Sequence, residues 1–257
     1  MGLRNALLDN FERALTCAGE QERQELLNVV IVGGGATGVE IAGALSEMKK
    51  YVLPKDYPDM PSSLMHIYLI EAGERLLPAM SPDSSAHVEK YLRSMGVNVL
   101  LNKMVTDYQD HRVILKDGSS IATRTFIWVS GVAAQKVGNL DASHLGRGAR
   151  IKVNACNQVE GLDGVFSIGD QCIMTEGDPN WPGGHPQLAQ VAIQQGVLLA
   201  KNLQRLEKGK EMKPFRYRNL GTMATVGRNK AVAEFKKVHM AGFMAWFMWL
   251  VVHLRSI

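Results

Sequence analysis

The pattern of hydrophobic and polar positions predicts alternating strands and helices in the first half of the chain. A continuous apolar run at 29–32 stops at three successive glycines, and apolar residues with helical spacing follow as far as Met48. This order predicts a strand, a tight turn and a helix. Residues 3–27 carry an earlier apolar pattern with a break at 17–19, which predicts a helix leading into that strand.

A second strand and a second helix follow after a stretch with three prolines at 49–63, which we expect to be a loop. The apolar run at 66–70 predicts the strand. Residues 81–95 begin with Ser-Pro-Asp, a helix-start signal, and end before a glycine, so they predict a helix. A third strand is expected at 97–101.

The next segment predicts a β-meander where a crossover helix would usually stand. Short alternating segments at 104–109 and 112–116 surround Asp110-His111, and a further apolar run covers 125–129. A dinucleotide-binding unit closed by a meander is typical of flavoprotein reductases that carry two dinucleotides.

The second half of the chain is richer in glycine and small residues, and its predicted elements are shorter. They are a strand-like piece at 150–154, an apolar strand at 165–170, a helix at 186–208 and two short strands within 217–235. The chain closes with an uncharged, mainly apolar segment within 241–257. This segment is too short to span a bilayer, which requires about 20 residues.

Composition narrows the class of protein. The 257 residues are 46% hydrophobic and carry a net charge of +4, without a long basic run, so the chain is globular and nucleic acid is not indicated. The cysteines, at positions 17, 156 and 172, form no C-x-x-C, which predicts neither a zinc site nor a redox dithiol. Because the histidines show no ligand spacing, we assign no metal.

The glycines after the first strand have the spacing of a dinucleotide fingerprint. Gly33, Gly35 and Gly38 fit G-x-G-x-x-G, in which glycines permit a sharp turn, close approach of a pyrophosphate and tight packing of helix on strand. The same glycines have the spacing of a P-loop, but Val39-Glu40 replaces the Lys-Ser/Thr that would bind phosphate and magnesium. A nucleotide triphosphatase is therefore disfavoured.

An acidic residue follows the second strand, where such units bind the adenosine ribose. Glu71 lies further from the glycines than the usual interval of about 20 residues, and the proline-containing stretch accounts for the excess. A carboxylate at this place repels a 2′-phosphate and favours NAD over NADP. Arg75 lies close by and keeps NADPH as the alternative.

Several motifs in order resemble a known family. The segments VVIVGGGATGVEIAGAL, LIEAGERLLP, WVSGVAA, VFSIGD and AQVAIQQG, followed by the aromatic C-terminal stretch, resemble the type II, non-proton-pumping NADH:quinone oxidoreductases over nearly the whole chain. The glycine motif alone is shared by many dehydrogenases, whereas the ordered set is more specific. In that family a hydride passes from NADH to FAD, and the reduced flavin gives two electrons to a membrane quinone.

The resemblance implies roles for individual residues. NADH would be held by Gly33, Gly35, Gly38 and Glu71. Asp170 would bind the ribityl or phosphate region of FAD, and Gly131 and Gly169 would be further cofactor-binding residues. Near the flavin ring and quinone head group would lie Ala189, Gln190 and Gln194. Glu40 corresponds to a glutamate suspected of handling protons in the family, so Glu40 and Gln194 are the candidate catalytic residues.

The resemblance also implies an α/β architecture. We expect a Rossmann-like NAD-binding domain with a β-meander, inserted in the remainder of an FAD-binding domain, plus the start of a C-terminal membrane-associated region. The expected boundaries are 1–27 for a leading helix from the FAD domain, 28–131 for the NADH domain, 132–209 for the C-terminal part of the FAD domain and 210–257 for the interface and membrane region. The apolar C-terminus would lie on the cytoplasmic face of the inner membrane, and the partners would include a membrane quinone and a second copy in a homodimer.

One departure from the family qualifies these expectations. No G-x-G-x-x-G stands upstream of Gly33, where such flavoproteins hold the ADP half of FAD. We therefore expect an internal fragment that binds NADH but lacks FAD and activity when isolated. A stand-alone NAD(H)-binding module without flavin, and a related reductase with a soluble acceptor, are the alternative functions.

Structural roles are the alternatives for the single residues. Glu40 would be an ordinary first-turn acid, favourable near the positive end of the helix dipole. Gln190 and Gln194 would be a solvent-facing pair, and Asp170 would be a turn residue. The aromatic cluster at 243–249 would be the core of a helix instead of a lipid-binding patch. Lys236 and Lys237 are expected to be solvated, with contact to a quinone or lipid phosphate as the alternative.

Overall fold

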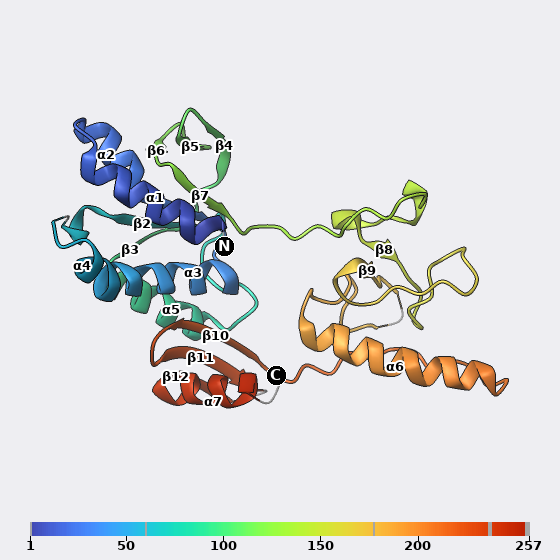
Figure 1. Cartoon of the computed structure of the whole chain (residues 1–257). Helices are drawn as coiled ribbons and strands as arrows, with labels where there is room; N and C mark the ends of the chain where they lie inside the picture. The colour runs from blue at the N-terminus through green and yellow to red at the C-terminus, as the bar shows by residue number, and fades with distance from the viewer. Residues whose placement is uncertain (1, 60, 177, 236–237, 255–257) are drawn as a thin grey trace. The chain divides into compact units, whose positions relative to one another are not determined.

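The computed structural model of the chain describes residues 2–59, 61–176, 178–235 and 238–254 (Figure 1). It divides into two compact units. The first consists of Met1–Gly131 with Gly221–Ile257, and the second of Val132–Leu220.

A parallel sheet of four strands in the order β3-β2-β1-β7 forms the centre of the first unit. The strands are β1 (Asn28–Val32), β2 (His66–Ile70), β3 (Val97–Leu100) and β7 (Thr125–Trp128). In register, Val30 lies opposite Tyr68 on one side and Phe126 on the other. Every residue of β1 is buried, as expected for a central strand covered on both faces. The α/β class with a parallel sheet is therefore confirmed.

Two predicted helices connect the sheet strands. Helix α3 (Ala36–Glu47) follows the glycine turn, and α5 (Pro82–Ser94) precedes β3. The hydroxyl of Ser81 accepts the N–H of Ser84 and caps α5, while Pro82 occupies its first turn. Gly96, with a φ of +84°, allows the chain to reverse into β3 after the helix.

The stretch predicted as a loop at 49–63 is largely helical, so that prediction was wrong. A π-helical turn η1 (Met48–Val52) continues α3, and α4 (Leu53–Asp56) and the short 3₁₀ turn η2 (Ser62–Leu64) follow. Pro54 lies in the first turn of α4. N–H groups in the first turn make no hydrogen bond within the helix, so a proline there loses none and does not break the helix.

The predicted meander is present as an antiparallel sheet of β4 (Val105–Gln109), β5 (Arg112–Leu115) and β6 (Ser120–Ala122). The sequence did not indicate β6, which is only three residues long. Val105, Val113 and Leu115 pack against the apolar residues of β1 and β2, and therefore close one face of the central sheet.

The leading segment forms two helices, α1 (Gly2–Thr16) and α2 (Glu20–Leu27), with the break at the expected position. Phe11 and Leu27 are buried in the main core of the first unit. The side-chain amide of Asn10 donates to the hydroxyl of Thr125 at 2.9 Å and fixes α1 to β7.

The C-terminal part of the first unit consists of an antiparallel sheet, β10 (Thr222–Gly227), β11 (Lys230–Phe235) and β12 (Val238–Gly242), and helix α7 (Phe243–Leu254). The two predicted strands correspond to β10 and β11, and β12 was missed. Gly43 of α3 allows β10 to approach closely, because a Cβ there would lie 1.8 Å from the carbonyl oxygen of Val226. Among the described residues, no helix is long and apolar enough to cross a bilayer.

The second unit contains little regular structure besides the long helix α6 (Ala189–Glu207). Its other elements are β8 (Ile151–Lys152), β9 (Cys172–Ile173) and the 3₁₀ turns η3 (Ala142–His144), η4 (Arg147–Ala149) and η5 (Gly169–Gln171). The strand expected at 150–154 shortens to β8, which pairs in parallel with β9.

Two further predictions in this unit were wrong in detail. The segment 165–170 is not a regular strand: Phe166 makes one isolated bridge to Gln158, and η5 begins at Gly169. Helix α6 starts three residues later than Pro186, because Leu188 is extended with φ −135° and ψ 144°.

The boundaries of the compact units differ from those of the predicted domains. Residues 2–27 pack in the core of the first unit, and residues 210–220 belong to the second. The boundary at 131 coincides with the predicted one. The assignment of these segments to NADH and FAD domains stays a prediction.

Candidate functional site

The turn between β1 and α3 depends on glycine at two positions. Gly33 has a φ of +116°, and its N–H donates to the carbonyl of Ile70 at 2.9 Å. At Gly38 a Cβ would lie 1.9 Å from the carbonyl oxygen of Gly33. The missing side chain of Gly38 therefore lets α3 begin in direct contact with the strand end.

Gly35 has a different place in the same turn. It is the residue before α3, and a Cβ added there would meet nothing within 4 Å. No side chain among the described residues caps this helix. The start of α3 therefore presents backbone N–H groups beside open space, which is the arrangement that binds an anion such as a pyrophosphate.

The carboxylate of Glu71 is fixed beside this turn. One oxygen, Oε2, accepts the N–H of Gly34 at 2.6 Å, and the other, Oε1, accepts the N–H of Gly73 at 2.7 Å. A carboxylate offers about four acceptor positions, so each oxygen retains capacity for a hydroxyl group. Gly33, Gly35, Gly38 and Glu71 thus lie together at the carboxyl end of the parallel strands, where open α/β sheets bind their ligands.

Arg75 lies in the loop after Glu71 and has an incompletely paired guanidinium. Its Nη2 donates to the carbonyl of Pro78 at 3.1 Å, whereas its buried Nη1 has no hydrogen-bond partner among the described residues. An unpaired buried donor is costly and is normally satisfied by a partner. The turn, Glu71 and this donor fit a nucleotide with ribose hydroxyls and phosphates.

Glu40 is exposed on α3, two residues after the last glycine of the turn. Its Oε1 accepts a hydrogen bond of 3.3 Å from the hydroxyl of Thr225 in β10. Because the residue is exposed, solvent reaches its side chain.

In the second unit, two predicted motifs meet through a residue that was not predicted. The buried side chain of Gln195 is 1% exposed, and its Oε1 accepts the N–H of Gly169 at 2.7 Å. Gly169 has a φ of +67°, and a Cβ there would lie 3.0 Å from that of Ala192. The absent side chain brings η5 against α6. Asp170 follows with an exposed side chain.

Gln190 and Gln194 hold an extended backbone segment beside α6. The Oε1 of Gln190 accepts the N–H of Leu220 at 3.0 Å. Gln194 pairs with both backbone groups of Arg218, since its Nε2 donates to the carbonyl at 2.9 Å and its Oε1 accepts the N–H at 3.0 Å. Further along the helix, Asn202 makes the same two-point contact with Lys213. These side chains therefore satisfy irregular backbone that has no sheet partner.

The two remaining predicted residues are Ala189 and Gly131. Ala189 is the exposed first residue of α6. Gly131, with a φ of +74°, is the last residue of the first segment of unit one, and a Cβ there would meet nothing within 4 Å.

A buried cluster that the sequence did not indicate joins the segment before α6 to the chain at Tyr217. Asp178 is 4% exposed and accepts hydrogen bonds from the Nε2 of His185 and the N–H of Tyr217, both at 3.1 Å. Burial raises the pKa of Asp178, but these hydrogen bonds and that from the N–H of Asn180 outweigh it and hold the pKa below its ordinary value. In the sequence, Asp178 and His185 are an isolated acid and an isolated histidine, and their spacing fits no motif that would have indicated the contact.

The cysteine side chains are free thiols in this structure. Cys17, Cys156 and Cys172 are unpaired, and burial raises the pKa of Cys172 to about 11. Such a thiol stays protonated at neutral pH and is a poor nucleophile. Within the described ranges, no group of three or more His, Cys, Asp or Glu side chains could hold a metal ion.

Comparison with known proteins gives a family match and several relatives. A family model described as pyridine nucleotide-disulphide oxidoreductase matches residues 5–196. The type II NADH:quinone oxidoreductase NdhA of Mycobacterium tuberculosis is 34% identical over 265 residues, which cover 98% of this chain and 55% of the relative. The type II NADH:quinone oxidoreductase of Haemophilus influenzae is 35% identical, over 86% of this chain and 51% of the relative.

The same fold occurs in a solved structure. NDH2 from Plasmodium falciparum in complex with NADH aligns with a TM-score of 0.88 at 19% identity, over 98% of this chain and 67% of that one. The chain spans about half the length of the curated relatives that it matches.

Proposed function

Because the chain belongs to the pyridine nucleotide-disulphide oxidoreductase family, we propose that it forms part of an FAD-dependent oxidoreductase that takes a hydride from NADH and passes two electrons to a membrane quinone. The observation that carries this proposal is the carboxylate of Glu71, held by two backbone N–H groups beside the glycine turn. The similarity to type II NADH:quinone oxidoreductases in sequence supports it.

Unit one supplies the NADH site in this proposal. The N–H groups at the start of α3 bind the pyrophosphate, which approaches the backbone at Gly35. Glu71 accepts hydrogen bonds from the ribose hydroxyls through the lone pairs that Gly34 and Gly73 leave open. Its negative charge disfavours a 2′-phosphate, so NADH is preferred to NADPH. Arg75 would be the residue to offset that repulsion if NADPH were bound.

Unit two supplies the FAD contacts of this chain. FAD, when bound, accepts the hydride and releases electrons to the quinone. In this unit, Gly169 and Asp170 are the residues that we assign to it, with the exposed Asp170 carboxylate as the acceptor for cofactor hydroxyl groups. Gly131, which belongs to the first unit, is assigned only as a further cofactor-binding residue. Ala189 and Gln190 at the start of α6 complete this set.

Two side chains are assigned to the later steps. Gln194 is assigned to the quinone site as a positioning residue. Its side-chain amide bonds to both backbone groups of Arg218, and this contact fixes the amide and the backbone segment at Arg218 together. Glu40 is assigned to proton handling, since it is exposed and accepts a long hydrogen bond from Thr225.

The membrane contact is assigned to one face of α7. Phe243, Phe247 and Val251 follow each other at four-residue spacing and are 56%, 50% and 41% exposed. Residues at this spacing share a helix face. An exposed apolar face that is too short to span a bilayer fits attachment to the cytoplasmic membrane surface, with a homodimer contact as the other use of the face. Lys236 and Lys237 lie outside the described residues.

The complete gene product, purified in detergent, should oxidise NADH with a soluble quinone analogue and should retain flavin. The matched control is the Gly38→Ala variant, which retains the remainder of the chain but obstructs the turn. Absence of quinone-dependent NADH oxidation in a flavin-loaded preparation would refute the proposal.

A second candidate function is a stand-alone NAD(H)-binding module. The observation in its favour is that the glycine turn and Glu71 all lie within the first compact unit. NADH binding by a preparation that never takes up flavin would support this candidate, whereas stoichiometric flavin would exclude it. A reductase with a soluble acceptor is a third candidate, and quinone-independent activity in solution would support it.

A further inference from the structure

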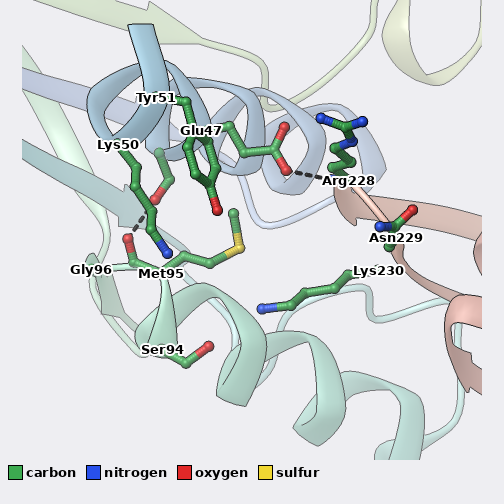
Figure 2. Close-up of a pocket in the computed structure, with 10 residues that line it drawn as sticks. Glu47, Lys50, Tyr51, Ser94, Met95, Gly96, Arg228, Asn229 and Lys230 are labelled. Carbon is green, nitrogen blue, oxygen red and sulfur yellow. Dashed lines mark hydrogen bonds between the residues drawn. The ribbon is translucent and has the colours of Figure 1, made fainter. Parts of the chain in front are cut away.

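A cavity of about 620 Å³ lies in the first unit, at the end of α3 opposite to the glycine turn (Figure 2). Its walls come from the end of α3 and from η1, from the end of α5 and the two residues after it, and from the turn that leads from β10 into β11. The lining residues are Ser46, Glu47, Lys50, Tyr51, 94–96 and 228–230. Helix α3 rises by about 1.5 Å per residue, so the cavity is about 16 Å from the start of that helix. It is therefore not part of the dinucleotide site.

The charge of this cavity is strongly positive. Lys50, Arg228 and Lys230 line it, and Glu47 is the single acidic lining residue. Oε1 of Glu47 already accepts the backbone N–H of Arg228. Within the part of the chain that the structure describes, none of the three cations has a carboxylate within ion-pair distance.

Two of the cations converge. Figure 2 shows the ammonium groups of Lys50 and Lys230 entering the cavity from facing walls, with the hydroxyls of Tyr51 and Ser94 directed at the same space. The Nζ of Lys230 lies 5.4 Å from the centre of the Tyr91 ring, and that of Lys50 lies 5.1 Å from the centre of the Tyr51 ring. These cation–π contacts orient the ammonium groups without neutralising them.

Attraction to helix ends does not account for this arrangement. Lysines are favoured near the carboxyl ends of helices, where carbonyl groups lack partners. At the end of α5, however, the N–H of Met95 already bonds to the carbonyl of Tyr91, and that of Gly96 bonds to the carbonyl of Arg93. The carbonyl of Met95 accepts the hydroxyl of Ser46. These carbonyls are therefore occupied, and the two ammonium groups remain available to an acceptor from outside the chain.

We propose that this cavity binds a phosphate-bearing anion. Lysine ammonium groups bind phosphate as point charges, and the hydroxyl of Tyr51 adds a donor to its oxygens. The hydroxyl of Ser94 already donates to the carbonyl of Tyr91 at 2.7 Å. The volume lies in the range of small-molecule sites, about 300–1,000 Å³, and exceeds that of phosphate alone. The Tyr51 ring and the Met95 side chain provide an apolar wall for an attached organic group. The phosphate belongs either to a free anion or to a lipid headgroup, and the experiment separates these sources.

The test is a calorimetric titration of the full chain at constant ionic strength, with inorganic phosphate and then pyrophosphate. The Lys50→Ala/Lys230→Ala variant should raise the dissociation constant at least about tenfold. The matched control, Lys55→Ala/Lys90→Ala, removes the same charge from exposed positions that do not line the cavity and should leave binding unchanged. Lys50→Arg/Lys230→Arg keeps the charge and should retain binding, which guards against a folding defect.

A second arm uses vesicles of phosphatidic acid with phosphatidylcholine, against vesicles of phosphatidylcholine alone. Vesicle binding with the same dependence on Lys50 and Lys230, without binding of the free anions, identifies a lipid phosphate as the ligand and supports the proposal. Binding of neither free anion nor acidic vesicle by the unaltered chain overturns it. Equal losses in the cavity variant and the control variant overturn it as well. NADH affinity, measured in parallel, should be the same in all variants.

Discussion

The side-chain oxygen of Gln195 accepts the backbone N–H of Gly169 at 2.7 Å inside the second unit. This bond joins the two motifs, VFSIGD and AQVAIQQG, that the resemblance assigns to the flavin. Because Gln195 is 1% exposed, its role is to fix η5 to α6.

Replacing Gln195 by leucine should destabilise the second unit. The apolar residue fills a similar volume but leaves the N–H of Gly169 buried and unpaired, which costs about 1–3 kcal/mol. Denaturation by urea measures the loss. Gln204→Leu, at an exposed position of the same helix, is the control and should change stability by less than about 0.5 kcal/mol. Equal stability of the two variants would contradict the role of the bond.

Alanine substitutions at two glycines of the turn should differ in their effects on stability and on NADH binding. Gly38→Ala forces a Cβ into the carbonyl of Gly33 and should cost about 1–3 kcal/mol of stability, as overpacking does. Gly35→Ala meets nothing within 4 Å, so its stability should stay within about 1 kcal/mol. Its methyl group should nevertheless weaken NADH binding about tenfold by blocking the pyrophosphate. Unchanged NADH affinity in Gly35→Ala would place the pyrophosphate elsewhere.

Acid should destabilise the second unit through Asp178. The pKa of Asp178 is lowered in the folded chain, so its contribution to stability is present above the unfolded value of about 3.9 and is lost as the pH falls through and below it. The unfolding free energy of the unaltered chain should therefore decline between about pH 5 and pH 3. Asp178→Asn should be less stable at pH 7 and show a smaller decline, whereas Asp163→Asn, at an exposed turn, should follow the unaltered chain. An Asp178→Asn variant with an unchanged pH slope would contradict the effect.

Gln194→Ala should impair the quinone half-reaction of the complete gene product. The variant removes both side-chain contacts with the backbone of Arg218, so the segment that we assign to the quinone site loses its support. Stopped-flow measurement should show flavin reduction by NADH unchanged, and quinone reduction slowed about tenfold, which corresponds to about 1.4 kcal/mol. Gln204→Ala serves as the matched control. Equal slowing of both half-reactions would indicate a purely structural role.

The parts of the fold that could be predicted are those specified by neighbouring residues. The apolar run of β1, the glycine spacing and the periodicity of α3 are local, and the structure has each of them at the expected position. Glu71 could be placed near the turn because the carboxyl ends of parallel strands meet at one edge of a sheet.

The remaining features depend on partners that are distant in the sequence. Gly43 is required by the carbonyl of Val226, and Gln195 by the N–H of Gly169, and neither pair has a local signal. The helical turns at 48–56 were missed because prolines indicate a loop unless they fall in the first turn of a helix. Gln190 and Gln194 have helical spacing, but the sequence could not show that Arg218 and Leu220 would be their backbone partners.

The most direct test of the NADH site is a comparison of NADH and NADPH binding between the unaltered chain and Glu71→Gln, followed by the fluorescence of the reduced nicotinamide. Glutamine keeps one acceptor oxygen for the backbone but removes the charge. The account predicts weaker NADH binding and an NADPH-to-NADH affinity ratio that rises at least about tenfold, since the repulsion of the 2′-phosphate is lost. An unchanged ratio, with NADH bound as tightly as before, would contradict the assignment of Glu71 to the ribose.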